Sequence, residues 1–234
     1  MNVIITGASR GIGRELLNRY LKKGAKVYAI ARDVSSIENL DGVEAIALDL
    51  SDLEAVERLS KRLSDKNIEV IICNAAISLP HSPNFTPFED FKKTIDINFL
   101  SVHALLSHIV PNMKSGKIVL ISSLASLVGA PTSMPYSASK RALNSYAESL
   151  RNLLAPDIEV INILPGFIKT DMTAKNNFYM PFLMELEEGV DRIEKAIQKG
   201  KKVYAFPKQF YYIIKLFNLL PVGLRDKILQ KVAK

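Results

Sequence analysis

The sequence has little cysteine and histidine, and its apolar runs are short. Cys73 is the single cysteine in 234 residues, so no internal disulfide forms, in agreement with a reducing compartment. The three histidines share no spacing with Cys, Asp or Glu, and we predict no metal. No apolar run approaches the roughly 20 residues of a membrane-spanning helix, and the first residues lack the pattern of a signal peptide. We therefore expect a cytoplasmic protein.

Positive charge is in excess, but it is concentrated near one end. The formal net charge is +7, and residues 208–234 alone hold six Lys or Arg against one Asp. The sequence contains no nucleic-acid-binding motif and no internal repeat, so we expect no nucleic-acid partner. The length suits a single domain spanning 1–234. Residues 208–234 are predicted to be a basic, apolar helical extension of it.

Short runs rich in Val and Ile alternate with longer segments of helical period. This alternation is typical of an α/β fold in which helices cover both faces of a doubly wound (Rossmann) parallel sheet, with ligands beyond the carboxyl ends of the strands. The predicted strands are 2–6, 26–31, 43–48, 68–73, 117–122, 158–164 and 202–206. The predicted helices are 11–23, 52–65, 88–110, 135–154 and 183–199.

A glycine-rich turn joins the first predicted strand to the first predicted helix. It reads Thr-Gly-Ala-Ser-Arg-Gly-Ile-Gly over residues 6–13, with glycines at 7, 11 and 13. Glycines at such a turn let a pyrophosphate approach the positive end of the helix. The spacing differs from the general G-x-G-x-x-G pattern, and an ordinary tight turn remains the alternative on this segment alone.

The turn resembles the nucleotide-binding turn of the short-chain dehydrogenase/reductase family, and further motifs follow in the order of that family. Asp49, at the end of the third strand, matches the acid that the family places against adenine. Asn74-Ala75-Ala76 resembles the family's Asn-Ala-Gly, with Ala76 as a departure that could tighten the adenosine pocket. The resemblance extends from residue 2 to about residue 172.

The end of the second strand bears on the choice of nicotinamide cofactor. An acid there would favour NAD, whereas a cation suits the 2′-phosphate of NADP. Ala31 occupies the position of the acid, Arg32 follows it, and Arg10 lies in the glycine turn, which resembles the NADP-preferring branch of the family. We predict NADPH/NADP⁺. Asp33, for which we favour a solvated or loop-capping role, keeps NAD(H) as an alternative.

The chemistry is predicted to reside in four polar residues. Tyr136 and Lys140 lie four residues apart on one helix, so they share a face, and a nearby ammonium lowers the pKa of a phenol. By resemblance, Tyr136 is the general acid, Ser123 binds the carbonyl oxygen, and Asn98 belongs to a proton relay that ends at Lys140. Ser122 is the neighbouring candidate, but strand alternation turns it to the other side.

The segment Pro165-Gly166-Phe167-Ile168-Lys169-Thr170 matches the family's Pro-Gly motif after the sixth strand. The resemblance implies that Ile168 meets the carboxamide of the cofactor and that Thr170 lies beside its phosphates. The residues predicted to bind cofactor are Gly7, Ser9, Arg10, Gly11, Ile12, Gly13, Arg32, Asp49, Leu50, Asn74, Ala75, Ala76, Tyr136, Lys140, Pro165, Gly166, Ile168 and Thr170.

Two long connections, 77–87 and 166–182, are of the kind that covers active sites. Apolar residues of the second connection point to a lipophilic carbonyl substrate, although they could equally belong to the core. These residues are Met172, Phe178, Tyr179, Met180, Phe182 and Leu183. The tail could cover the pocket, contact another subunit, or make a peripheral membrane contact through its lysines.

Together these features predict an NADPH-dependent reductase that converts a ketone or aldehyde into an alcohol. An NAD-dependent alcohol dehydrogenase is one alternative. A non-catalytic NADP(H)-binding regulatory protein is another, although such a protein has no need of a proton relay. By resemblance, helices such as 88–110 and 135–154 pair between subunits, which implies a homodimer or homotetramer.

Overall fold

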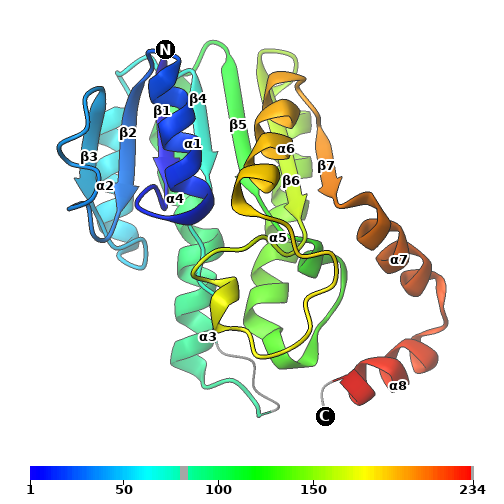
Figure 1. The fold of residues 1–234 in the computed structure, drawn as a ribbon. Coiled ribbons are helices and arrows are strands. Elements are labelled where there is room, and N and C mark those ends of the chain that lie inside the picture. The colour runs from blue at the N-terminus through cyan, green and yellow to red at the C-terminus, as the bar shows by residue number, and fades with distance from the viewer. Residues whose placement is uncertain (80–83, 233–234) are drawn as a thin grey trace.

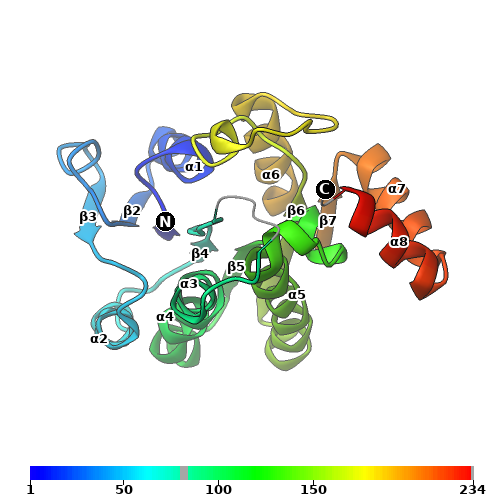
Figure 2. The same cartoon turned by 90° about the horizontal axis from the view of Figure 1, so that it is seen from below.

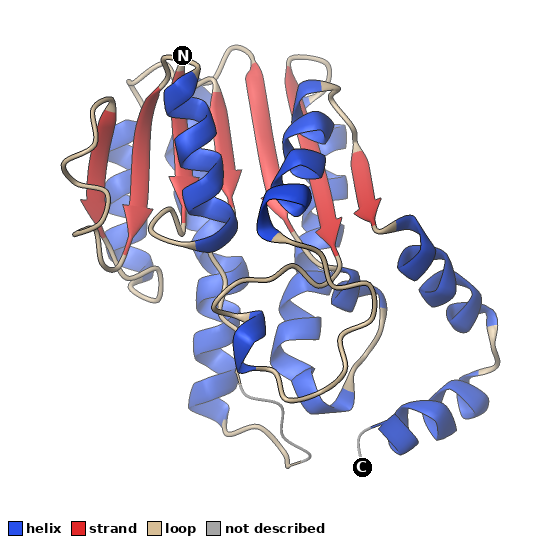
Figure 3. Ribbon diagram, in the orientation of Figure 1, coloured by secondary structure: helices blue, strands red, loops and turns tan. Residues whose placement is uncertain are grey.

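The computed structural model describes residues 1–79 and 84–232, so part of the predicted connection 77–87, His81 and the last two residues of the tail lie outside it. Seven strands form one parallel sheet in the order β3-β2-β1-β4-β5-β6-β7 (Figure 3). The doubly wound α/β prediction is therefore confirmed. The strands are β1 (Asn2–Thr6), β2 (Lys26–Ala31), β3 (Val43–Ala47), β4 (Val70–Cys73), β5 (Gly116–Ile121), β6 (Ile158–Pro165) and β7 (Val203–Phe206).

Helices cover both faces of the sheet, as the views from the side and from below show (Figures 1 and 2). One face carries α1 (Gly11–Lys22) and α6 (Leu186–Gln198), and the other carries α2 (Leu53–Leu63), α4 (Ser101–Ile109) and α5 (Met134–Leu154). Each face has its own apolar core, because side chains of successive strand residues point to opposite sides. The chain changes sides between β1 and β4, which are neighbours in the sheet, and this opens a binding position at their carboxyl ends.

The predicted helix 88–110 is not uniform. The structure divides it into α3 (Phe88–Ile95), a π-helical segment η1 (Asp96–Leu100) and α4, followed by a 3₁₀ turn over Val110–Asn112. A π turn inserts extra chain into a helix and is often found at functional sites. Here Asn98 lies inside it with a fully buried side chain.

The predicted helix 183–199 begins later than expected, at Leu186. Met184 instead forms an isolated parallel β-bridge with Ile168. The Met184 N–H donates to the carbonyl of Phe167, and the Met184 carbonyl accepts from the N–H of Lys169. These main-chain bonds fix both ends of the connection 166–182. A helix starting at residue 183 would break them.

Two further helices follow β7: α7 (Lys208–Leu219) and α8 (Val222–Val232). They project beyond the β7 edge of the sheet and form the orange and red part of the chain (Figure 1). Throughout the described residues, no helix combines the length and the apolar character needed to cross a membrane.

Candidate functional site

A cleft of about 760 Å³ opens at the carboxyl ends of the strands. It extends from the loops after β2 and β3, past the glycine turn, to the start of α5. Nearly every residue predicted to bind cofactor lines it, together with Ser123, Tyr136 and Lys140. Gly13 and Asn98 do not line the cleft. Gly13 packs against Gly7 behind the glycine turn, and Asn98 is fully buried. Lining residues that were not predicted include Ile30, Leu48, Ile77, Ser78, Ile97, Asp171 and Lys175.

The glycine turn is packed so closely that side chains are excluded from it. A Cβ on Gly13 would lie 2.1 Å from the carbonyl oxygen of Gly7, and Gly7 itself has a positive φ of 68°. The Asn74 amide donates to the carbonyls of Thr6 and Gly7 at 3.0 and 3.3 Å. The turn is therefore fixed from behind by the loop after β4.

The start of α1 fits a phosphate group. Its N-cap residue, Arg10, makes no capping hydrogen bond through its side chain, and the first turn of the helix contains no acidic residue. Free N–H groups at a helix N-terminus favour an anion. Thr170 faces this turn from the opposite wall, since a Cβ on Gly11 would lie 3.4 Å from its methyl group. The cleft and its glycine cradle thus fit a dinucleotide.

The charged groups at the far end of the cleft are arranged around two arginines. Arg10 lies 3.8 Å from Asp171, an exposed pair that contributes little to stability. The pKa of Asp49 is lowered, first by a hydrogen bond from the Ser51 main chain and also by Arg32. The carboxylate of Asp33 accepts hydrogen bonds from the N–H and hydroxyl of Ser35, at 3.0 and 2.7 Å. Asp33 therefore caps its own loop.

Tyr136 stands at the other end of the cleft, in the first turn of α5. Burial raises the pKa of its phenol above the usual value of 10, and a hydrogen bond with Ser123 acts in the opposite direction. The expectation that Lys140 lowers this pKa is therefore corrected: in the structure, burial dominates. Ser123 lies two residues after the end of β5 and also accepts a hydrogen bond from the N–H of Ala125, which orients its hydroxyl.

Lys140 is only 2% exposed, although it carries an ammonium group. Its Nζ donates to the carbonyl of Ile121 at 2.7 Å and lies 5.8 Å from the centre of the Tyr136 ring. Burial lowers the pKa of Lys140 from 10.5 to about 8. Protonation of this group is consequently sensitive to pH in the range where many enzymes work.

Asn98 uses its side chain to hold the loop after β4. Its Oδ1 accepts from the N–H of Ile77 at 2.8 Å, and its Nδ2 donates to the carbonyl of Ile77 at 2.9 Å and to the hydroxyl of Ser139 at 3.1 Å. Ser139 precedes Lys140 on α5. The π turn thereby links the loop that lines the cleft to the helix that carries Tyr136 and Lys140.

Asn144, which sequence reasoning missed, lies one turn beyond Lys140. Its Oδ1 accepts from Ser122 at 2.7 Å and from the Asn162 amide at 2.9 Å, and its Nδ2 donates to Ser126 at 2.6 Å. It thus joins α5 to β5, β6 and the turn after Ser123. Ser122 also lines the cleft, so the prediction that it turns to the other side is only partly right: its hydroxyl donates to Asn144 within this polar cluster. The spacing of residues 136, 140 and 144 could have indicated Asn144, because residues four apart lie on one face of a helix.

A second cavity of about 360 Å³ meets the cleft at Tyr136 and Ser78. Leu79, Phe85 and Pro135 give it apolar surface, and Ser133 and Asp90 add polar groups. Of the apolar residues predicted to line a lid, Met172 lines the main cleft. Phe178 and Phe182 instead belong to an aromatic cluster with Phe167 and Phe210.

The comparisons with known proteins agree with this geometry. The sequence profile of the short chain dehydrogenases matches residues 1–179. The chain belongs to the short-chain dehydrogenase/reductase family. Members of this family are oxidoreductases. An uncharacterized oxidoreductase of Myxococcus xanthus is 32% identical over 98% of this chain and 96% of its own length. A fatty acyl-CoA reductase of Acinetobacter baylyi is 32% identical over 85% of this chain and 73% of its own length.

Two solved structures superpose on most of this chain. A short-chain dehydrogenase of Burkholderia cenocepacia in complex with NADP has a TM-score of 0.83 at 27% identity, covering 97% of this chain and 96% of its own. A 4-hydroxyisoleucine dehydrogenase complexed with NADH and succinate has a TM-score of 0.77 at 25% identity, covering 87% of this chain and 96% of its own. Within the described residues, no His, Cys, Asp and Glu side chains form a group suited to hold a metal ion.

Proposed function

We propose that this dehydrogenase/reductase is an NADPH-dependent reductase that converts a lipophilic ketone or aldehyde into the corresponding alcohol. The observation that carries the proposal is the position of Ser123, Tyr136 and Lys140 together at one end of a cleft whose other end holds the glycine turn and two arginines. One end supplies proton chemistry, and the other suits a phosphorylated ribose and a pyrophosphate.

In the proposed reaction, a bound reduced nicotinamide would supply the hydride that reduces the carbonyl carbon. The carbonyl oxygen accepts hydrogen bonds from Ser123 and Tyr136 and takes the proton of the Tyr136 phenol as its electron density rises. The raised pKa of Tyr136 keeps the phenol protonated at neutral pH, so it has a proton to give. The hydrogen bond with Ser123 stabilises the phenolate that remains, and the Lys140 ammonium lies 5.8 Å from the centre of the Tyr136 ring.

The preference for NADPH is supported by charge. Arg10 and Arg32 both line the cleft, the second strand ends in the neutral Ala31, and the carboxylate of Asp33 is engaged with Ser35. A 2′-phosphate would thus meet guanidinium groups, which bind phosphate through charge-assisted hydrogen bonds. The relative solved with NADP supports the same preference, whereas the relative solved with NADH represents the alternative.

The substrate class is supported by the second cavity. Its volume of about 360 Å³ suits a small organic molecule, and it opens directly at Tyr136. Leu79 and Phe85 line it, and none of the described residues around it carries a basic side chain that would bind a phosphorylated or carboxylated substrate. The similarity to a fatty acyl-CoA reductase supports the lipophilic choice.

The test is the oxidation of NADPH and of NADH in the presence of a panel of lipophilic ketones, aldehydes and quinones. We expect turnover with NADPH. We also expect Arg32→Ala to weaken NADPH binding by about tenfold to a hundredfold, with NADH binding nearly unchanged. Tighter binding of NADH than of NADPH by the unaltered protein would reject the cofactor assignment. Binding of NADPH without turnover of any carbonyl would favour a regulatory, non-catalytic protein.

A further inference from the structure

Helix α7 is apolar on both of its sides, but only one side is packed. The inner side carries Ile214, which lies in a small core with Leu124 and Leu164. Asn218 anchors the same side by donating to the carbonyl of Leu127 at 2.9 Å. This inner side explains why α7 folds against the sheet edge and the turn after Ser123.

The outer side of α7 is exposed, although it is apolar. Leu219 is 81% exposed, and Leu216 is 66% exposed. A helix that is apolar all around is normally buried on every side. The exposed apolar residues continue from α7 onto α8, and they are Tyr212, Ile213, Leu216, Leu219, Val222, Leu224 and Ile228.

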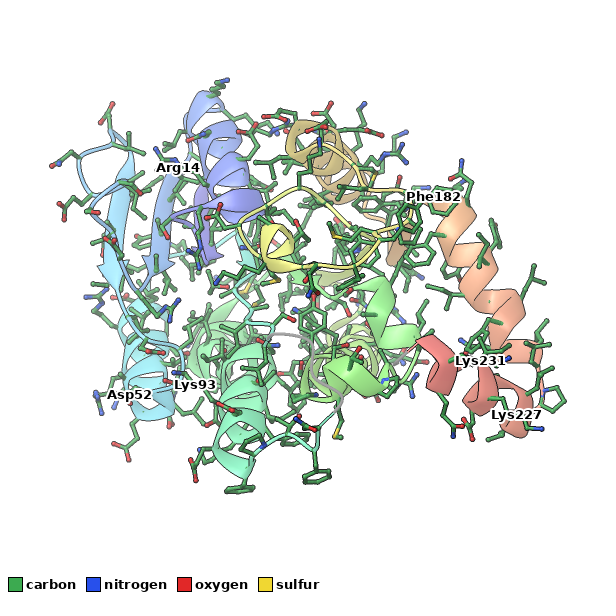
Figure 4. The ribbon with its side chains drawn as sticks, turned by 60° about the horizontal axis from the view of Figure 1, so that its bottom comes forward. Arg14, Asp52, Lys93, Phe182, Lys227 and Lys231 are labelled. Atoms are coloured by element: carbon green, nitrogen blue, oxygen red, sulfur yellow. The ribbon has the colours of Figure 1, made fainter. Side chains whose placement is uncertain are left out.

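Basic side chains border this apolar surface. Lys208 and Lys215 are exposed and lie four residues before Tyr212 and Leu219 on α7. Lys227 and Lys231 lie along α8 (Figure 4). None of the four forms an ion pair with any residue in 1–79 or 84–232. Asp226 is the single acidic residue of the two helices.

We propose that the arm formed by α7 and α8 docks on the surface of a bilayer that contains anionic lipid. Its apolar residues would enter the headgroup boundary while the lysines contact lipid phosphates, as in interfacial amphipathic helices. The charge of this surface argues against a second copy of the chain as the partner that covers it. In a two-fold contact the surface meets itself, so two patches of the same net positive charge would be brought together with one aspartate per chain to compensate.

The arm is joined to the connection 166–182 through Phe210 near the start of α7. The Phe210 ring stacks on Phe167 at 6.0 Å between centres and meets Phe182 at 5.9 Å. Phe182 lies beside the beginning of α7 (Figure 4). If the proposed function holds, a lipophilic carbonyl dissolved in the bilayer would reach the cleft from this side, and this consequence rests on that function.

The test is sedimentation of the purified full chain with vesicles, which does not depend on turnover. We expect the protein to sediment with vesicles of equal parts phosphatidylcholine and phosphatidylglycerol at low salt and to remain in solution with phosphatidylcholine alone. The double variant Leu216→Glu/Leu219→Glu should lower the partition coefficient by roughly a hundredfold, because two leucines no longer leave water. Lys208→Ala/Lys215→Ala should lower it by about thirtyfold.

Matched controls carry the same changes elsewhere. Leu153, on α5, is 77% exposed, and Leu153→Glu should leave sedimentation unchanged. Lys61→Ala/Lys114→Ala removes two charges from other exposed sites, with an expected effect below about twofold. Thermal melting checks that every variant is folded. The proposal is overturned if the unaltered protein stays in solution with both vesicle types, or if Leu216→Glu/Leu219→Glu dissociates an oligomer in light scattering without altering sedimentation.

Discussion

The ammonium of Lys140 donates a hydrogen bond of 2.7 Å to the main-chain carbonyl of Ile121, with only 2% of the lysine exposed. Burial lowers the pKa of this group to about 8. If catalysis requires the charged form, kcat/KM for carbonyl reduction should fall as the pH rises through about 8. In Lys140→Arg, which stays charged, any residual activity should not show this alkaline fall. A profile that is flat up to about pH 10 would contradict this role of Lys140.

The same pKa predicts the opposite trend for stability. Between pH 8 and 10.5 the unfolded chain retains the Lys140 proton while the folded chain has released it, so raising the pH favours the folded state. The free energy of unfolding, relative to that of Lys140→Met, should rise by about 2 to 3 kcal/mol between about pH 7 and about pH 10. Urea unfolding of both proteins at several pH values measures this difference. A constant difference would show that Lys140 titrates normally, and a decreasing one would show that its pKa is raised; either result would contradict the prediction.

Gly13 is predicted to tolerate no side chain. Because a Cβ there would lie 2.1 Å from the Gly7 carbonyl oxygen and 2.6 Å from the Asn74 amide nitrogen, Gly13→Ala must displace the turn. We expect NADPH affinity to fall by at least about a hundredfold, with a lower melting temperature. Gly223→Ala is the control, since a Cβ at Gly223, in α8, meets no atom within 4 Å. Equal behaviour of the two variants in NADPH titrations would refute this description of the turn.

Asn144 is predicted to be a positioning residue for α5. Asn144→Leu removes three hydrogen bonds and leaves Ser122, Ser126 and Asn162 without this partner, which should cost about 2 to 4 kcal/mol of unfolding free energy. It should also lower kcat more than it weakens NADPH binding, because Asn144 lies beside the Ser123 and Lys140 end of the cleft. Asn152→Leu, at an exposed site on the same helix, should change neither quantity appreciably. A loss of stability with unchanged kcat would make Asn144 purely structural.

Much of this arrangement could be predicted from the sequence because its signals are local. Alternating apolar runs and helical periods predicted the parallel sheet, and the glycine spacing predicted a turn that the packing around Gly13 explains. Ligands of such sheets bind beyond the carboxyl ends of the strands, and most of the candidate residues do line one cleft there.

Features that depend on distant contacts were missed. The π turn around Asn98 coincides with side-chain bonds to Ile77, 21 residues earlier, and apolar periodicity does not register such an insertion. The direction of the Tyr136 pKa was also wrong, because the spacing of Tyr136 and Lys140 indicates proximity but not the depth of burial. Asn144 lacked a visible partner because Ser122, Ser126 and Asn162 come from separate segments of the chain.

The central claim is that the Tyr136 phenol gives its proton to a carbonyl oxygen, and Tyr136→Phe tests it most directly. The measurement is single-turnover oxidation of bound NADPH by a carbonyl substrate, paired with a fluorescence titration of NADPH. Removal of the phenol hydroxyl should slow turnover by roughly a hundredfold to ten-thousandfold and change the Kd for NADPH by less than about threefold. A variant that oxidises NADPH at nearly the rate of the unaltered protein would contradict the account.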